Sequence, residues 1–385
     1  MKLNELKTVA VIGAGLMGHG IGQVALMAGY HLNLCDVKQE FVDRGVNLIY
    51  QSLDKFASKG KISEEAVAKI KESGITTYTS IAEAVKDAQF IVEAVPERMD
   101  IKNSTLAQIS AACSPDAVIS TNSSTMSITE LSKAVEKPER FVGVHYFFPA
   151  VLMKLVEVIR GDATSDETTA FAKAYAEHVG KTVVVAQKDR PGFIANRIVA
   201  PVVVYNGLMV DRDGFTPADI DLSMMKNGQK MGPMELADFT GVDMTSFCQD
   251  YYHEHLSPEY EPSNAAKKLL AEHKLGKKTG QGYYTWPEKG RPVIDESLYT
   301  GKYNPDSPNF IQANEACKLL EEGVCSLEEC DTAMELGYNM EGPIHYIQRF
   351  EPQQIADALN AVADHFGKEI FRPVATIITG AYKRG

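Results

Sequence analysis

Three glycines stand at a fixed spacing directly after an apolar run, residues 8–12, in the sequence Gly13-Ala-Gly15-Leu-Met-Gly18. In a strand–turn–helix unit, the first glycine allows a tight turn, the second lets the backbone approach a pyrophosphate, and the third lets the helix pack closely on the strand. Amides at the helix N-terminus then meet the phosphate charge. The motif predicts a dinucleotide-binding loop, and the alternative is a glycine-rich turn that only packs tightly.

Asp36 ends the second predicted strand, residues 31–36. An acid at this position accepts hydrogen bonds from a ribose 2′-hydroxyl and repels a 2′-phosphate. The sequence therefore favours NAD over NADP as the cofactor. FAD fits less well, because nothing else in the chain suggests an isoalloxazine pocket.

His145 ends another apolar run, residues 141–145, and Glu157 lies inside a further one, residues 154–159. Hydride transfer to a nicotinamide needs a group that takes the alcohol proton, and histidine is the usual choice. A carboxylate on one ring nitrogen would fix the tautomer and leave the other nitrogen for substrate. Taken singly, His145 is typical of a hydrogen-bonded strand end and Glu157 of a solvated charge. Burying an unpaired acid in an apolar strand is costly, however, which favours a pair.

The first half of the chain, residues 1–188, alternates β-branched runs with amphipathic stretches. Strands are predicted at 8–12, 31–36, 90–94, 118–121, 141–145, 154–159 and 182–186, and helices at 16–28, 42–59, 64–73, 101–113 and 168–179. Such alternation implies parallel pairing through right-handed crossovers, hence an open sheet covered on both faces.

Helical periodicity dominates from Pro191 onward, after the turn-forming residues 188–192. Residues 206–235 and 315–345 echo each other: each has a helix, a glycine turn, a second helix capped at Thr216 or Ser326, and a Gly-Pro break. We therefore expect an α/β domain over 1–188, a first helical domain over 189–285, and a linker with a second helical domain over 286–385.

Composition narrows the class of protein. The 385 residues are 44% hydrophobic and 23% charged, which predicts an ordinary globular protein. A net charge of −12 disfavours nucleic acid and membrane surfaces as partners, and no apolar run is long enough for a span. The six cysteines include no C-x-x-C pair, so neither a metal site nor a disulfide framework is expected. Together with the polar segment 1–7, which predicts no signal peptide, this favours the cytoplasm.

Six motifs of the chain resemble, in order and spacing, those of the L-3-hydroxyacyl-CoA dehydrogenases of fatty-acid β-oxidation. They are Gly13-Ala-Gly-Leu-Met-Gly18, Ser120-Thr-Asn-Ser-Ser124, Gly143-Val-His145-Tyr-Phe, Met153-Lys-Leu-Val-Glu157-Val-Ile, Pro191-Gly-Phe-Ile-Ala-Asn196-Arg and Gly276-Lys-Lys-Thr-Gly-Gln-Gly-Tyr283. The resemblance covers residues 5–285. It implies a Rossmann-like NAD-binding domain, then an all-α domain of the 6-phosphogluconate dehydrogenase type. The second helical repeat resembles the duplicated C-terminal portion of multifunctional β-oxidation proteins.

The resemblance implies NAD-dependent oxidation of an (S)-3-hydroxyacyl-CoA to a 3-oxoacyl-CoA. It makes His145 the general base and Glu157 its orienting partner. Ser124 and Asn196 would hydrogen-bond the reacting oxygen or the thioester carbonyl, with a helix N-cap as the alternative for Ser124. Further matched positions contact NAD (Leu16, Met17, Asp36, Glu97, Lys102, Ser124 and Lys278) or coenzyme A (Ser52 and Lys59).

One residue departs from the family pattern. Phe148 stands where the family usually has Asn and sometimes Ser, three residues after the histidine. Phe148 cannot hydrogen-bond the nicotinamide or the substrate, so the local pocket and its substrate should differ. The acyl chain, the physiological direction and the pathway do not follow from the sequence.

Two rival interpretations remain. A β-hydroxyacid or 6-phosphogluconate-type dehydrogenase would resemble its relatives in placing a lysine base early in the helical domain, where this chain has Asn196. A non-catalytic, crystallin-like homologue would not need the His145 and Glu157 pair. For assembly, we expect a monomer whose helical repeats pack as a pseudo-dimer, with a homodimer as the alternative.

Overall fold

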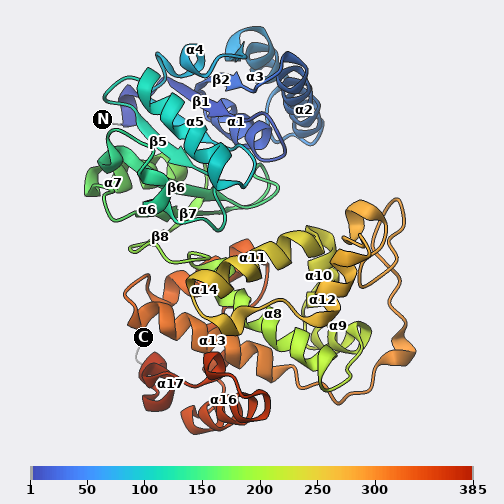
Figure 1. Ribbon diagram of the computed structural model, residues 1–385. Coiled ribbons are helices and arrows are strands. Elements are labelled where there is room, and N and C mark those ends of the chain that lie inside the picture. The colour runs from blue at the N-terminus through green and yellow to red at the C-terminus, as the bar shows by residue number, and fades with distance from the viewer. Residues whose placement is uncertain (1–2, 384–385) are drawn as a thin grey trace. The chain divides into compact units, whose positions relative to one another are not determined.

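The computed structural model of the protein describes residues 3–383. The chain divides into two compact units between Phe193 and Ile194 (Figure 1). The first unit is built around a β-sheet, and the second is helical.

The first unit contains an eight-stranded sheet in the order β3-β2-β1-β4-β5-β6-β7-β8. The strands are β1 (Thr8–Ile12), β2 (His31–Cys35), β3 (Ile75–Tyr78), β4 (Phe90–Glu93), β5 (Val118–Thr121), β6 (Phe141–Tyr146), β7 (Leu155–Ile159) and β8 (Thr182–Ala186). Strands β1 and β4 are parallel neighbours, and the strand order reverses between them. In open α/β sheets, ligands bind outside the carboxyl ends of the strands at such a switch point.

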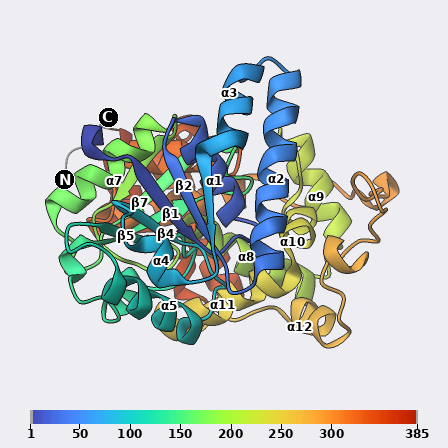
Figure 2. The ribbon, with the colours of Figure 1, turned by 90° about the horizontal axis from the view of Figure 1, so that it is seen from above.

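Helices cover this sheet on both faces, as its burial requires. They are α1 (Gly18–Met27), α2 (Gln39–Ser58), α3 (Glu64–Lys69), α4 (Ile81–Val85), α5 (Met99–Ala112), α6 (Ile128–Ser132) and α7 (Asp166–His178). Strands β4 to β7 are buried along their whole length, so their side chains pack on both sides. Figure 2 shows α2 and α3 side by side next to α1.

Every strand predicted from the sequence is present, but the predicted all-parallel pairing is wrong at one place. Strands β6 and β7 pair antiparallel. Parallel neighbours need a crossover of a dozen or more residues, and the segment 147–154 is too short for one. The sequence also missed β3, because this edge strand is only partly buried and has no apolar run. The predicted helix 64–73 ends earlier, at Lys69, and continues as a π-helical turn, Ile70–Gly74.

The second unit is helical, apart from isolated bridges at Gln281. Its helices are α8 (Ala195–Asp211), α9 (Pro217–Lys226), α10 (Pro233–Thr240), α11 (Val242–His255), α12 (Asn264–Ala271), α13 (Asp306–Glu321), α14 (Leu327–Gly337), α15 (Pro343–Ile347), α16 (Pro352–Phe366) and α17 (Ala375–Thr379). Helix α8 packs against α13 and α14. The described helices include none long and apolar enough to cross a membrane.

The same capping arrangement occurs twice in this helical unit. Thr216 caps α9 and Ser326 caps α14. In α9, the buried carboxylate of Asp221 accepts hydrogen bonds from two backbone amides at the start of α10. In α14, the half-buried carboxylate of Asp331 does the same for two amides at the start of α15. A glycine lies against each carboxylate, and a Cβ on Gly232 or Gly342 would come within 2.2 or 2.5 Å of the carboxyl carbon. The two stretches that echo each other in sequence therefore share this detail of local structure.

Candidate active site

The loop between β1 and α1 has the geometry of a phosphate cradle. Gly13 has a φ of +104°, and a Cβ there would lie 2.5 Å from the carbonyl oxygen of Ala94. A Cβ on Gly18 would lie 1.7 Å from the carbonyl oxygen of Gly13, so the helix packs on the turn as only glycine allows. Gly15, in contrast, faces open space. The first turn of α1 also has no acidic residue, which suits an approaching anion. The residues present therefore fit a pyrophosphate.

Asp36 follows β2 directly and lies against this loop. Its Oδ2 accepts a hydrogen bond from the Ala14 amide at 2.8 Å, and its Oδ1 accepts one from the Val37 amide. The carboxylate is half-buried beside the glycines. A ribose hydroxyl brought in by a dinucleotide on the loop would meet an acceptor here.

His145 and Glu157 face each other across the β6–β7 pair. They are direct partners in the strand register, and His145 Nδ1 lies 2.7 Å from Glu157 Oε2. The side chains are 5% and 0% exposed, and the imidazole packs against Phe147 and Phe193. Between residues 3 and 383 the imidazole makes no second hydrogen bond, so Nε2 can exchange a proton with a substrate when Nδ1–H donates to the carboxylate.

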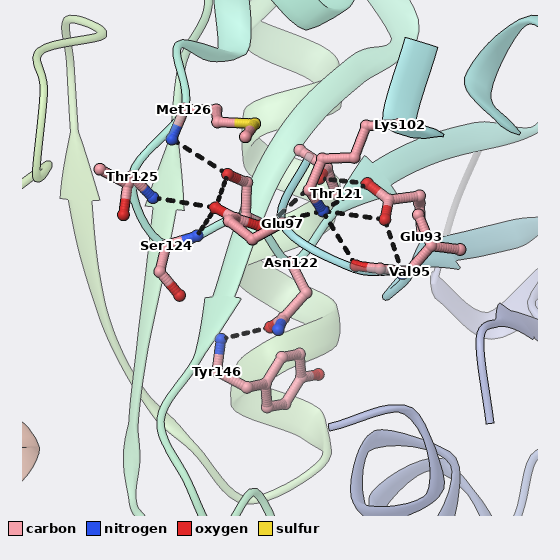
Figure 3. Close-up of polar contacts among 11 residues, drawn as sticks. Glu93, Val95, Glu97, Lys102, Thr121, Asn122, Ser124, Thr125, Met126 and Tyr146 are labelled. Atoms are coloured by element: carbon pink, nitrogen blue, oxygen red, sulfur yellow. Dashed lines mark hydrogen bonds and ion pairs between the residues drawn. The ribbon is translucent and has the colours of Figure 1, made fainter. Parts of the chain in front are cut away.

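A buried ionic cluster lies at the carboxyl ends of β4 and β5. Figure 3 shows the Lys102 ammonium between the carboxyl groups of Glu93 and Glu97. Lys102 Nζ lies 2.9 Å from a carboxylate oxygen of Glu93 and 3.2 Å from one of Glu97. Thr121 completes it by donating its hydroxyl to Glu93 at 2.6 Å. Burial alone would lower the pKa of Lys102, but the negative charges of the two glutamates outweigh it and raise that pKa above its ordinary value.

This cluster holds the loop that follows β5. One carboxylate oxygen of Glu97 accepts hydrogen bonds from the Ser123 hydroxyl and from the amides of Ser124 and Thr125. In the same loop, Asn122 Oδ1 accepts a hydrogen bond from the backbone amide of Tyr146, the residue after His145 (Figure 3). The two atoms are 2.8 Å apart. The loops after β4 and β5 are thus tied to each other and to the last residue of β6, next to His145. The N-cap of α6 is Ser127 and not Ser124, which removes the capping alternative for Ser124.

The loop between β6 and β7 is held by a lysine that precedes β8. Lys181 Nζ donates hydrogen bonds to the carbonyl oxygens of Ala150 and Met153. Burial lowers the pKa of Lys181 to about 8. Phe148 lies in this same loop and is 49% exposed.

The structure brings some of the sequence-predicted site residues together and leaves others apart. Gly13, Gly15, Gly18 and Asp36 form one group, and Glu97, Lys102 and Ser124 form a second. The remaining residues lie on other elements: Leu16 is exposed and Met17 half-buried at the start of α1, Ser52 lies in α2, Lys59 follows α2 and is exposed, Asn196 lies in the first turn of α8, and Lys278 pairs with Asp243 at 2.5 Å in the helical unit.

Sequence reasoning missed several residues that support the site. Glu93, Thr121, Asn122 and Lys181 were not singled out. Glu93 had the same signal as Glu157, an acid inside an apolar run, and applying that argument twice would have found it. The other three are ordinary polar residues at strand ends or loops, and only the fold shows what they contact.

A Rossmann-type sheet with a phosphate cradle, an acid beside it and a buried His–Glu pair define an NAD-dependent dehydrogenase. The family description "3-hydroxyacyl-CoA dehydrogenase, NAD binding domain" matches residues 8–190, and the description of the C-terminal domain of the same enzymes matches residues 192–286. The chain belongs to the 3-hydroxyacyl-CoA dehydrogenase family. The predicted family, cofactor and oxidoreductase class are thereby confirmed.

Individual relatives agree with this assignment. A probable 3-hydroxyacyl-CoA dehydrogenase of Caenorhabditis elegans is 38% identical over 291 residues, which cover 74% of this chain and 97% of the relative. The fatty acid oxidation complex subunit alpha of Idiomarina loihiensis is 36% identical over 368 residues, covering 89% of this chain and 51% of that protein. The crystal structure of 3-hydroxybutyryl-CoA dehydrogenase from Escherichia coli aligns over 98% of both chains, with a TM-score of 0.89 and 26% identity.

Proposed function

We propose that this NAD-dependent enzyme oxidises an (S)-3-hydroxyacyl-CoA with His145 as the general base and Glu157 as its orienting partner. The observation that carries the proposal is the in-register pair of β6 and β7, whose 2.7 Å hydrogen bond is buried. When bound, NAD accepts the hydride that leaves C3 of the substrate. His145 takes the hydroxyl proton on the ring nitrogen opposite Glu157. The carboxylate stabilises the imidazolium that results, which general base catalysis requires.

The other site residues take roles around this pair. Gly13, Gly15 and Gly18, with Leu16 and Met17 between them, hold the pyrophosphate, and Asp36 accepts the ribose hydroxyl. Glu97, Lys102, Ser124 and Lys278 complete the cofactor site, Lys102 and Glu97 through the loop that they fix. Ser124 and Asn196 hydrogen-bond the reacting oxygen or the thioester carbonyl, and Ser52 and Lys59 contact the coenzyme A portion.

The helical unit is proposed to contain two tandem repeats, residues 189–285 and 286–385, after an α/β domain of residues 1–188. The repeated capping by Asp221 and Asp331 and the packing of α8 on α13 support this division. If the second repeat covers the apolar face of the first, the protein is a monomer with a pseudo-dimeric core. A homodimer is the alternative, since Phe239, Met244 and Phe247 of α10 and α11 are each more than a third exposed.

Two further features bear on substrate choice and location. Phe148, exposed in the loop after β6, replaces the usual Asn with an apolar side chain, so we expect the ranking of acyl groups to differ from that of family members with Asn. All six cysteines are free, as a reducing compartment keeps them, and the cytoplasm is the location that this suits.

The test is the substitution His145→Gln. Removing a general base typically lowers the rate by about 10² to 10⁴. Turnover of acetoacetyl-CoA with NADH, followed at the NADH absorbance band, should fall by that factor, while the dissociation constant for NAD stays unchanged. His178→Gln, an exposed histidine at the end of α7, is the matched control and should turn over normally. Wild-type turnover in the His145 variant would remove this residue from the mechanism.

A further inference from the structure

Asn196 lies in the first turn of α8, and its side-chain amide forms a hydrogen bond with Tyr338, a residue much later in the sequence. The Tyr338 hydroxyl donates a hydrogen bond to Asn196 Oδ1 at 2.7 Å. Both side chains are half-buried, and Tyr338 stands at the C-terminal end of α14, a helix that packs against α8. The regions that match the two family descriptions end at residue 286, so Tyr338 lies in a part of the chain that neither match covers.

Arg197, the next residue of this turn, also binds residues from the later part of the helical unit. Arg197 Nε lies 2.5 Å from Glu315 of α13, and Arg197 Nη2 lies 3.2 Å from Glu322, the residue after α13. The Arg197 and Glu315 side chains are 6% and 1% exposed. Burial would raise the pKa of Glu315, but Lys318 and Arg197 outweigh it and lower that pKa, so the carboxylate stays charged. Two successive residues of α8 are thus fixed by partners from α13 and α14.

In the structure the Tyr338 hydroxyl donates to Asn196 Oδ1, and this bond sets the orientation of the amide. The amide oxygen accepts a hydroxyl hydrogen, which the amide nitrogen does not. With Oδ1 turned toward Tyr338, the Nδ2 hydrogens are directed to the opposite end of the amide group. A hydroxyl, keto or thioester oxygen of the substrate is an acceptor, and only the Nδ2 end can donate to it.

We propose that Tyr338 is a positioning residue of the active site, which presents the donor end of Asn196 to the oxygen of the acyl-CoA substrate. The second helical repeat therefore takes part in catalysis in addition to covering the first repeat. This inference rests on the proposed role of Asn196 as a substrate contact.

The experiment is a double-mutant cycle of Tyr338→Phe and Asn196→Ala, with kcat/KM for acetoacetyl-CoA and the dissociation constant for NADH measured in each variant. Phenylalanine keeps the ring and removes only the hydroxyl. Losing one neutral hydrogen bond should lower kcat/KM by about 3- to 10-fold. NADH binding should stay as in the wild type, and the thermal midpoint should fall by no more than it does in Tyr346→Phe. Tyr346→Phe is the matched control, because its hydroxyl donates to Asp306 at 2.6 Å elsewhere in the second repeat.

The cycle separates the possible failures. In the Asn196→Ala background, adding Tyr338→Phe should change kcat/KM by less than about twofold, because the amide to be oriented is gone. If Asn196→Ala lowers kcat/KM and Tyr338→Phe does not, the positioning role is refuted and the role of Asn196 stands. If Asn196→Ala has no effect, its role as a substrate contact is refuted, and the role of Tyr338 with it. Equal losses from Tyr338→Phe in both backgrounds, or the same loss in Tyr346→Phe, would show a purely structural bond.

Discussion

Replacing Lys102 by methionine tests the buried ionic cluster beside the site. Methionine fills most of the space of the lysine stem but removes the ammonium, which lies 2.9 Å from Glu93 and 3.2 Å from Glu97. The Glu93 carboxylate would then be fully buried without a cation. Removing one partner of a buried pair costs about 3–5 kcal/mol. Two donors to Glu93 remain, the Thr121 hydroxyl and the Val95 amide, so we expect about 3 kcal/mol, the lower end of that range.

Urea unfolding is the assay, because it can be followed separately in the two units. The chain has a single tryptophan, Trp286, and it lies in the helical unit. Its fluorescence reports that unit, whereas circular dichroism reports both. Lys102→Met should shift the circular dichroism transition of the sheet unit and leave the fluorescence transition in place. Lys133→Met, which breaks an exposed ion pair with Glu130, should cost less than about 1 kcal/mol.

A second substitution distinguishes the origin of the loss. Adding Glu93→Gln to Lys102→Met removes the stranded charge and should restore more than half of the lost free energy of unfolding. NAD affinity should recover with it if Lys102 acts through the loop that Glu97 fixes. Recovery of stability without recovery of NAD affinity would show that Lys102 contacts the cofactor itself. A Lys102→Met protein as stable as the Lys133→Met control would refute the reasoning from the cluster.

Four further outcomes are expected. Asp36→Ala should weaken NAD binding and improve NADP relative to NAD, because the 2′-hydroxyl acceptor and its charge vanish together; an unchanged ratio of the two affinities would mean that another residue reads the ribose. Phe148→Asn should change the ranking of acyl-CoA substrates more than the NAD affinity, whereas equal effects on every acyl-CoA would make it a packing residue. Removing the residues after Pro308 should expose apolar surface of α8 and cause aggregation or new dimerisation, and light scattering that finds a stable, active monomer would refute the pseudo-dimer. The pKa of Lys181 in the folded protein, about 8, lies below its unfolded value, so the contribution of Lys181 to stability increases as pH rises from 8 toward 10. The difference in unfolding free energy between wild type and Lys181→Met should therefore widen over that interval, by at most about 1.4 kcal/mol per pH unit. A constant or shrinking difference would contradict this.

Much of the sheet unit could be predicted from sequence because its strands are buried on both faces. Burial makes them continuous apolar runs, which are visible in one dimension, as in residues 90–93 and 155–159. Strand β3 lacked that signal because it lies at the edge of the sheet. The antiparallel pairing of β6 and β7 departs from the parallel pairing that alternating strands and helices predict, because the segment 147–154 contains no crossover helix.

The site divides in the same way. Gly13, Gly18 and Asp36 could be found because the motif is local and each position has a steric or electrostatic requirement. His145 and Glu157 could be paired by chemistry alone. Tyr338 could not be connected with Asn196, since the residues are 142 positions apart and neither has a local pattern. Contacts of that kind depend on how helices pack, which short-range periodicity does not encode.

The His145 and Glu157 pair belongs to a single antiparallel ladder, and this affects how the enzyme can change during evolution. Backbone hydrogen bonds of β6 and β7 set the register that places the two side chains opposite each other. A deletion within either strand would shift the register and turn one side chain to the other face of the sheet. The connecting segment 147–154, which contains Phe148, lies outside the paired residues of this ladder and is long enough to take up an inserted residue. Under the proposed mechanism, insertions there would change the surroundings of the substrate while the His145 and Glu157 pair is inherited unchanged.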